Sequence, residues 1–425
     1  MSKILTELAA SRRSGNPYGI TSICSAHPVV LRAALRRAAK RGRPVLIEAT
    51  CNQVNQFGGY TGMTPADFVA FFEGIAFEEG VRRDQIIFGG DHLGPNPWRK
   101  EPAESALKKA ADLVEAYVAA GFSKIHLDAS MGCLGEPSAP DDETVAARAA
   151  GLCAVAERTA TRMGVAPPVY VLGTEVPIPG GADHELDVVE PTAPEAARKT
   201  IAVHRRAFTK AGLANALHRA IAFVVQPGVE FGSDNVIAYD PARAENLSAL
   251  LEEETGLVFE AHSTDYQTEA ALAALVRDGY PILKVGPGLT FAYREVLYGL
   301  DLIASEIVPG YGERSLAKSM EALMQAKPEN WKGYYHGDET AQHIQRHFSY
   351  SDRIRYYWNE QDAEAAVQRL LTSLNGVHIP KTVLRQYLPN AAPADTQGIE
   401  LIILNAVVLA LYERAAEGVD GAARY

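Results

Sequence analysis

Eight short apolar runs, rich in β-branched residues, alternate with longer amphipathic segments along the first 310 residues of this chain. Strands that alternate with helices predict a parallel sheet, and apolar runs without polar alternation predict strands buried on both faces. Eight strand–helix units are the number that closes a (β/α)8 TIM barrel, so we predict an α/β fold of this kind. A doubly wound open sheet is the alternative, but the chain has neither a GxGxxG after its first strand nor a GxxxxGK[ST] motif. The expected strands span 19–24, 44–48, 86–90, 124–127, 169–173, 222–225, 257–260 and 281–285.

The chain follows a different pattern after residue 310. Residues 311–425 lack a strand series and predict a helical C-terminal extension packed on the barrel of residues 1–310. Aromatic clusters at 331–335 and 350–358 indicate packing, and a surface for a partner is the alternative, because Tyr, Trp and Arg are enriched at binding hot spots. The expected helices of the extension span 314–326, 338–347, 360–374, 381–388 and 398–416.

The net charge of −11 and the pI near 5.6 argue against nucleic acid or an anionic membrane as partners. They leave a phosphorylated substrate open, because backbone N–H groups and one lysine can bind phosphate on an acidic protein. The four cysteines are widely spaced without a CxxC pair, so reduced thiols and a cytoplasmic location are expected. The first residues lack the pattern of a signal peptide, and no apolar run approaches the ~20 residues that span a membrane.

Polar side chains follow nearly every predicted strand. The carboxyl ends of parallel barrel strands form the active face of such enzymes. Burying unpaired charges is expensive, so a purely structural barrel gains nothing from this ring of polar residues. We therefore expect a functional site at this end of the barrel. The ring comprises Cys24, Ser25, His27, Glu48, Thr50, Asn52, Asp91, His92, Asp128, Ser130, Glu175, Gln226, Glu230, His262, Asp265 and Lys284.

Three members of the ring suggest a metal site. His92, His262 and Glu175 supply two imidazoles and a carboxylate, a ligand set typical of catalytic zinc with one open position. Asp91, beside a ligand, is the expected proton donor or acceptor. Such a site suits the polarisation of a sugar carbonyl, which is aldolase or epimerase chemistry. Asp128 is a catalytic carboxylate or a helix cap, with equal weight, and His126 is expected in the core or against the helices rather than at the site.

The last strand suggests where a phosphate binds. The sequence VGPG at 285–288 supplies small residues and free N–H groups after the eighth strand, where barrel enzymes commonly bind phosphate. The HIQRH stretch at 343–347 lacks the glutamate of HExxH, so its histidines, like His336, are interpreted as surface or packing residues. The expected substrate- and phosphate-binding residues are Glu48, Asn52, Gln226, Ser263, Asp265, Lys284, Gly286 and Gly288.

Several longer stretches carry a family resemblance. They extend from the first predicted strand through the eighth, and NQVNQFGGYTGMTP is long and unusual enough to be specific. The chain closely resembles the non-catalytic subunit family of class II D-tagatose-1,6-bisphosphate aldolase, which serves galactitol and N-acetylgalactosamine catabolism. The matching stretches are CSAHP at 24–28, VLIEATCNQVNQFGGYTGMTPADF at 45–68, GGDHLGPN at 89–96, GFSKIHLDASM at 121–131, GTEVPIPGG at 173–181, VVQPGVEFG at 224–232, AHSTDYQ at 261–267 and LKVGPGLTFA at 283–292.

The resemblance implies a (β/α)8 fold and distant kinship with the catalytic class II aldolases, which carry an Asp-His pair and two further histidine ligands. Asp91 and His92 match the pair and His262 matches the last histidine, whereas Gln226 stands at the place of the middle ligand. The glycine-rich phosphate turn of those enzymes is also altered here. Both departures argue against independent aldol cleavage. Glu175 would replace the missing ligand, so that the site would still bind a divalent metal, for which zinc is the first candidate.

The resemblance also implies a function. It favours an accessory subunit that supports the activity and stability of a separate catalytic aldolase subunit, in an oligomer. Some relatives are reported as C4 epimerases of ketohexoses, so a metal-dependent ketose or ketose phosphate 4-epimerase or aldolase, acting by retro-aldol chemistry, is the alternative. Other relatives are labelled tagatose-6-phosphate kinases, which this sequence does not support because it lacks a P-loop.

Overall fold

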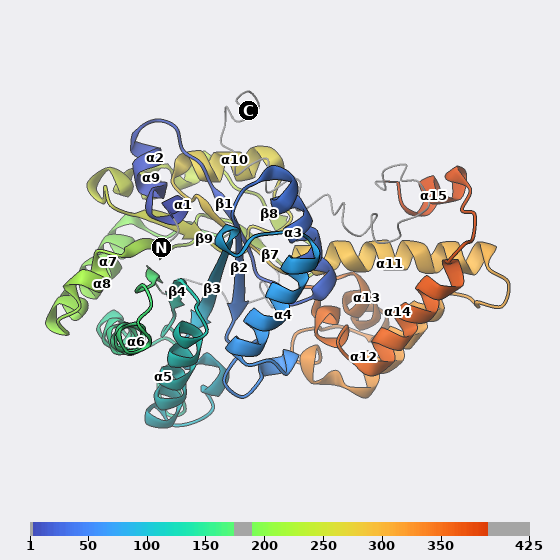
Figure 1. Cartoon of the computed structure of the whole chain (residues 1–425), viewed down its shortest axis with the longest axis horizontal. Helices are drawn as coiled ribbons and strands as arrows, with labels where there is room; N and C mark the ends of the chain where they lie inside the picture. The colour runs from blue at the N-terminus through green and yellow to red at the C-terminus, as the bar shows by residue number, and fades with distance from the viewer. Residues whose placement is uncertain (1–2, 174–188, 390–425) are drawn as a thin grey trace.

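Eight parallel strands close into a barrel in the computed structural model of this chain, which describes residues 3–173 and 189–389 (Figure 1). Around the barrel the strands follow the order β1-β2-β3-β4-β5-β6-β9-β10, and β10 pairs with β1 to close the sheet. The predicted (β/α)8 fold is confirmed, and each expected run overlaps one barrel strand. The strands are β1 (Ile20–Ile23), β2 (Val45–Thr50), β3 (Ile86–Leu93), β4 (Lys124–Leu127), β5 (Val169–Leu172), β6 (Ala220–Val224), β9 (Val258–Ala261) and β10 (Ile282–Val285), with a separate hairpin of β7 (Glu230–Phe231) and β8 (Val236–Ile237).

Helices surround the barrel, and the helix that follows the last strand extends away from it toward the side (Figure 1). Aromatic packing attaches them: Phe72 of α4 meets Phe88 of β3 edge to face at 5.4 Å between ring centroids. Thr64 begins α4 through a capping box with Asp67. The helices are α1 (Lys3–Thr6), α2 (Leu8–Arg13), α3 (Pro28–Arg41), α4 (Pro65–Glu78), α5 (Ala103–Ala119), α6 (Asp142–Met163), α7 (Pro194–Lys210), α8 (Ala214–Leu217), α9 (Pro241–Glu253) and α10 (Glu269–Asp278), with short 3-10 turns η1 (Gly59–Thr61), η2 (Arg83–Gln85) and η3 (Asn96–Trp98).

The barrel interior is filled in layers. Near the beginning of the strands, Leu46, Ile87 and Ile282 form an apolar layer together with Leu5 and Leu8 from the N-terminal helices. Successive strand residues face opposite sides, so the next inward positions lie two residues further along each strand. In this protein those positions carry charges and form an ionic layer of Glu48, Lys124, Glu260 and Lys284, which are at most 5% exposed.

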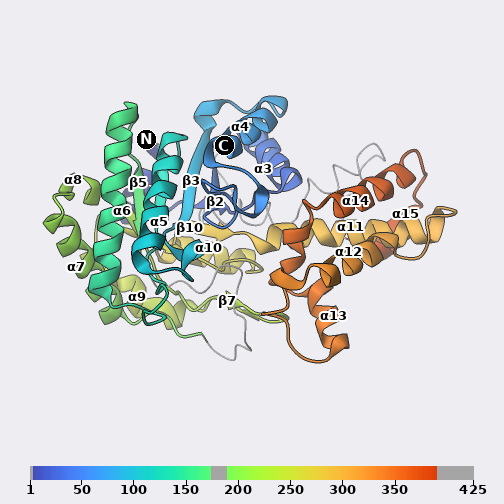
Figure 2. The same cartoon turned by 90° about the horizontal axis from the view of Figure 1, so that it is seen from below.

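The C-terminal part of the described chain forms a second hydrophobic core beside the barrel. Helix α11 begins against the barrel core at Leu289 and continues into the second core at Leu297. Figures 1 and 2 show the later helices grouped along the outer part of α11. These elements are α11 (Pro287–Ile307), α12 (Ser315–Ala326), α13 (Glu339–Phe348), α14 (Gln361–Leu374) and α15 (Lys381–Tyr387), with 3-10 helices η4 (Pro328–Asn330) and η5 (Arg353–Tyr357).

The aromatic clusters of the extension mostly serve packing, as predicted: Trp331, Tyr335, Tyr357 and Trp358 are buried in the second core. The expected helix at 398–416 lies outside the described residues, and the division of the chain at residue 310 stays a prediction. Within residues 3–173 and 189–389, no helix combines the length and apolar character that a membrane crossing requires.

Candidate active site

The ionic layer forms the floor of the site. Lys124 Nζ lies 2.5 Å from Glu48 Oε1 and 2.7 Å from Glu260 Oε2, and Lys284 Nζ lies 2.9 Å from Glu48 Oε2. Lys284 also contacts the carboxylate of Asp91, one layer higher. The absence of a side chain at Gly89 admits this arrangement, since a Cβ there would lie 2.6 Å from Glu48 Cγ.

The pKa shifts of Lys124, Glu260 and Lys284 favour their charged forms despite burial. Burial acts to lower the pKa of Lys284, but Asp91 and the neighbouring carboxylates outweigh it and hold that pKa well above its ordinary value. Burial acts in the opposite direction on Asp91, and His92 and Lys284 hold its pKa well below the usual range. Because buried ion pairs rarely stabilise a fold better than apolar packing does, this layer indicates a function for the charges above it.

A bulge in β3 directs two consecutive side chains into the barrel. The pairing of β3 with β4 shifts register between Gly90 and Leu93, so Asp91 and His92 escape the strict alternation of a strand. His92 has a φ of 51°, in the left-handed region that ordinary residues rarely adopt. Ser263, across the cavity, has a φ of 52°. Strained backbone of this kind is concentrated at functional sites, and here it aims the Asp-His pair at the cavity.

The two predicted histidine ligands are each held by a carboxylate behind them. His92 Nδ1 donates to Asp128 Oδ2 at 2.8 Å, and His262 Nε2 donates to Glu260 Oε1 at 2.9 Å. Metal-binding histidines typically donate their second ring nitrogen in this way, which fixes the ring and its tautomer. Asp128 therefore acts through His92, and it is not among the residues that line the pocket. Burial lowers the pKa of His262 to about 3, whereas Asp91 and Asp128 outweigh burial and raise the pKa of His92 above its ordinary value.

His126 is buried, as one of its two expected positions required, but it lies beside the candidate site. His126 lies inside the barrel, with Nδ1 3.0 Å from Asp91 Oδ1, and not against the helices. Its neighbours Ile125 and Leu127 both pack in the outer core, so alternation turns His126 and Lys124 inward. The side on which the apolar neighbours of a strand residue pack therefore indicates which face of the sheet that residue occupies.

The residues at the centre fit a divalent cation. Among the described residues, Asp91, His92, His126 and His262 each offer a ligand atom, and these atoms lie within 4.8 Å of one another. His126 Nε2 is buried and has no hydrogen-bond partner in the described part of the chain. Around the cluster, the buried carboxylates of Asp91, Asp128, Glu48 and Glu260 exceed the ammonium groups of Lys124 and Lys284 by two negative charges. Three imidazoles, a carboxylate and this excess suit zinc or a similar ion.

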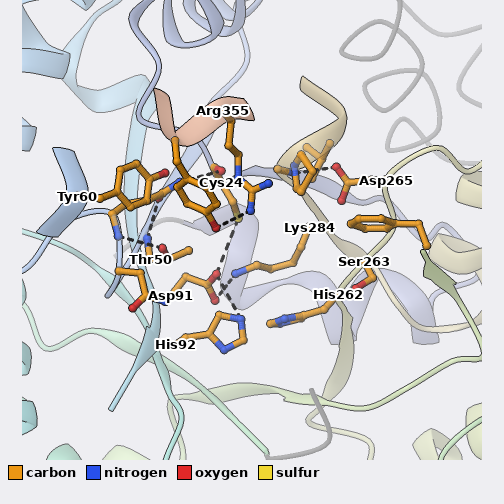
Figure 3. Close-up of a pocket in the computed structure, with 17 residues that line it drawn as sticks. Cys24, Thr50, Tyr60, Asp91, His92, His262, Ser263, Asp265, Lys284 and Arg355 are labelled. Atoms are coloured by element: carbon orange, nitrogen blue, oxygen red, sulfur yellow. Dashed lines mark hydrogen bonds and ion pairs between the residues drawn. The ribbon is translucent and has the colours of Figure 1, made fainter. Parts of the chain in front are cut away.

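The cluster opens into a pocket at the carboxyl ends of the strands, with about 700 Å³ of empty space including its mouth (Figure 3). Of the predicted substrate residues, Asn52, Ser263, Asp265, Lys284 and Gly286 line this pocket. Glu48 lies beneath it in the ionic layer, and Glu175 lies outside the described residues. Among the residues that the structure describes, the lining is Cys24, Thr50, Asn52, Gln53, Tyr60, Asp91, His92, Phe231, His262, Ser263, Asp265, Lys284, Val285, Gly286, Pro287, Arg355 and Tyr356.

Gln226 and Gly288 do not line the pocket. Gln226 Oε1 instead accepts hydrogen bonds from the backbone N–H groups of Gly228 and Val229, at 2.8 and 2.9 Å, and so fixes its own loop. The spacing of residues in the sequence does not show that the Gln226 amide binds its own loop rather than a ligand.

The expectation of free N–H groups in the VGPG turn is also wrong. Asp265 Oδ1 accepts hydrogen bonds from Gly286 N at 2.9 Å and Gly288 N at 2.7 Å. The side chain that follows β9 thus occupies the position at which a phosphate would use these amides. Burial raises the pKa of Asp265 to about 6, although the two N–H groups act to lower it.

The extension contributes residues that the sequence analysis did not assign to the site. Arg355 and Tyr356 of η5 line the pocket, and Tyr356 stacks edge to face with Tyr60 at 5.0 Å. In Figure 3 the Arg355 side chain points down from η5 over Asp91 and Lys284. The sequence of the cluster at 350–358 suggested packing or an interface. This segment lies 70 residues beyond the last strand, and no spacing in the sequence predicts that it covers the barrel mouth.

This fold and site define a (β/α)8 barrel protein with a histidine–carboxylate centre above a buried ionic layer. Residues 5–412 match the family described as D-tagatose-1,6-bisphosphate aldolase subunit GatZ/KbaZ-like. The chain belongs to this family, and the predicted family resemblance is confirmed.

Two relatives illustrate the similarity. A protein of Agrobacterium fabrum named D-tagatose 6-phosphate 4-epimerase is 65% identical over 419 residues, covering 98% of this chain and 99% of the relative. A crystal structure from Sinorhizobium meliloti 1021, described as a probable tagatose 6 phosphate kinase, is 55% identical with a TM-score of 0.84, covering 93% of this chain and all of that one.

Proposed function

We propose that this protein is a metal-dependent epimerase that inverts C4 of a ketohexose phosphate, with tagatose 6-phosphate as the substrate. The single observation that carries the proposal is the buried cluster of Asp91 with three histidines at the floor of a pocket. An accessory subunit that acts only by protein contact has no need of such a cluster. The 65% identical relative is named for this activity, and it matches this chain over nearly its whole length. This similarity supports the same proposal.

The residues of the chain suit retro-aldol chemistry. Asp91, held ionised by His92 and Lys284, accepts the proton of the C4 hydroxyl while the bond between C3 and C4 breaks. The electron pair of that bond stays on the three-carbon enediolate fragment, and the aldehyde fragment turns within the pocket. The bond then re-forms on the opposite face of the aldehyde, and a proton returns to the new C4 oxygen. A cation held by His92, His126 and His262 would polarise the ketone and stabilise negative charge.

The proposal is tested with the full chain alone. Purified protein loaded with zinc should convert tagatose 6-phosphate into its C4 epimer, fructose 6-phosphate, detected by NMR. Dialysis against a chelator should abolish conversion, and added zinc should restore it. If the zinc-loaded chain forms no epimer, the proposal is wrong.

A second candidate is the accessory subunit that the sequence favoured, and the family description as an aldolase subunit supports it. In this case a catalytic class II aldolase subunit is the partner. Mixing the two purified proteins should raise aldolase activity or its heat stability. An Asp91→Asn variant that stimulates a partner as well as the wild-type chain does would separate this role from the epimerase.

The kinase description of the Sinorhizobium structure does not guide the proposal. The chain has no GxxxxGK[ST] sequence, and the pocket joins histidines to carboxylates rather than presenting free amides to a nucleotide.

A further inference from the structure

Among the described residues of the pocket lining, the lysine and arginine side chains are Lys284 at the floor and Arg355 at the mouth. Lys284 lies among three carboxylates, at 2.9 Å from Glu48, 3.8 Å from Glu260 and in contact with Asp91. Arg355 has a different environment: Asp352 and Asp265 act on its charge, but within the described residues no carboxylate oxygen lies at ion-pair distance from its guanidinium. The positive charge at the mouth is thus available to a ligand, whereas the charge at the floor is neutralised.

Neutral groups accept hydrogen bonds from the two Nη atoms of Arg355. Nη1 donates to the carbonyl oxygens of Ser351 and Asp352, and Nη2 donates to Tyr356 Oη at 2.8 Å. An arginine carries five N–H donors, so in the described part of the chain Nε–H and one Nη2–H remain for a ligand. Two adjacent N–H groups of a planar guanidinium match two oxygens of a phosphate group.

The segment that carries Arg355 is fixed to the barrel mouth. Tyr350 N donates to Ser233 O at 2.8 Å, Tyr266 Oη donates to Tyr350 O at 2.6 Å, and Thr290 Oγ1 donates to Asp352 Oδ2 at 2.6 Å. These contacts come from the β7–β8 turn, the loop after β9 and helix α11. The guanidinium is therefore placed over the pocket before any ligand arrives, which reduces the entropy cost of binding.

The usual alternative position for a phosphate is occupied. Asp265 accepts the N–H groups of Gly286 and Gly288, so the turn after β10 presents a carboxylate where an anion would need donors. A phosphate in this pocket is repelled from that turn and attracted toward Arg355.

We propose that Arg355 of the C-terminal extension binds the phosphate group of the sugar substrate at the pocket mouth and thereby selects phosphorylated over free ketoses. This inference rests on the proposed epimerase function, and it names the residue that determines the substrate class. The phosphate of a ketohexose 6-phosphate is attached two carbons from C4, so an anion site at the mouth leaves C4 directed toward the floor.

The test compares a phosphorylated and a free sugar in matched variants. Arg355→Ala should raise the KM for tagatose 6-phosphate roughly 10- to 100-fold, because hydrogen bonds to charged groups contribute about 1.5–3 kcal/mol. The kcat/KM for tagatose itself should stay within about threefold of the wild-type value. Arg355→Lys keeps the positive charge but loses the two adjacent N–H donors, so its KM for tagatose 6-phosphate should lie between those of the wild type and Arg355→Ala. Arg369→Ala, an exposed arginine of α14, is the control and should behave as wild type.

Inorganic phosphate provides a readout that needs no turnover. Calorimetry should show phosphate binding to the wild-type chain and to Arg369→Ala, and about tenfold weaker binding to Arg355→Ala. If the wild type converts neither sugar, the epimerase proposal fails while this titration still decides the anion site. Equal losses on both sugars, or unchanged phosphate affinity in a folded Arg355 variant, would overturn the inference. Should Arg355→Ala not fold, Arg355→Lys carries the same comparison.

Discussion

Two clusters of histidines and carboxylates lie close enough to hold a cation in the described chain, one in the barrel and one in the extension. The barrel cluster joins Asp91 to three histidines beneath an open pocket, among buried carboxylates that outnumber the lysines. In the extension cluster, formed by Glu321, His343 and His347, Arg346 binds the carboxylate of Glu321, with Nε at 2.9 Å.

The extension cluster is already neutralised and satisfied. His347 Nε2 lies 2.9 Å from Glu321 Oε2, and its Nδ1 lies 2.5 Å from Tyr298 Oη. These bonds join α13 to α12 and α11, so the cluster stabilises the second core. Ligand types at suitable spacing therefore do not suffice to identify a metal site. An excess of buried negative charge and an adjoining cavity distinguish the reactive centre from the structural cluster.

The largest expected effect separates the two clusters by catalysis. Asp91→Asn removes the proton acceptor and should lower kcat for the 4-epimerisation by roughly 10³-fold, within the range of general acid–base catalysis. Glu321→Gln in the extension should leave kcat near the wild-type value. Steady-state kinetics with matched thermal denaturation curves make the comparison. Equal turnover in the two variants would remove the distinction.

The next effect concerns metal affinity. His262→Ala removes a ligand from the barrel cluster and should weaken zinc binding by about 100-fold, at least as much as loss of a supporting contact behind a ligand. His343→Ala in the extension should retain both the affinity and the stoichiometry of the wild type. Competitive titration of zinc against a chromogenic chelator measures both. Loss of zinc from His343→Ala instead would show that the extension holds the ion.

The extension cluster should matter for stability. Glu321→Gln removes the charge that pairs with Arg346, a side chain only 3% exposed, and should lower the free energy of unfolding by roughly 1–2 kcal/mol. Denaturant unfolding measures the change. Glu313→Gln, which disrupts an exposed pair with Lys318, is the control and should leave stability unchanged. A destabilisation shared by both variants would argue against a structural role specific to the cluster.

The smallest effect is a pH dependence. Burial lowers the pKa of His347 to about 4, although Glu321 acts to raise it. In the unfolded chain a histidine has a pKa near ~6.5, so the stability present above that pH is lost as the pH falls toward 4. His347→Gln should make the loss of unfolding free energy between pH 7 and pH 5.5 smaller by about 1 kcal/mol. Denaturant curves at the two pH values measure this, and an unchanged dependence would contradict the assignment.

The sequence predicted the barrel well because its signals are local. Apolar runs such as 169–173 and amphipathic helices such as 102–120 each carry their own period, and eight repetitions define the closed sheet. The sequence also singled out the Asp91–His92 pair and His262, which the structure places near the carboxyl ends of β3 and β9. Position at a strand end is a signal that one stretch of sequence contains.

The remaining parts of the site depend on contacts between distant segments. The sequence places His126 opposite Leu127 on its strand but does not show which of the two faces the barrel interior. The bulge that turns both Asp91 and His92 inward has no local signature. Glu260 and Lys124 were overlooked, as their partners lie on other strands. Arg355 belongs to a separate helical unit whose position over the mouth follows from tertiary packing alone.

The ionic layer has a consequence for how this chain is made. Glu48 and Lys284 pair across 236 residues, and Lys124 pairs both with Glu48 and with Glu260 of β9. A nascent chain that has emerged only as far as β6 holds the Glu48–Lys124 pair but lacks the two later partners, Glu260 and Lys284. In such a half-barrel the carboxylate of Asp91 has no ammonium group of Lys284 beside it. The charges at the floor therefore reach their final pairing only when β10, the last strand, joins the barrel.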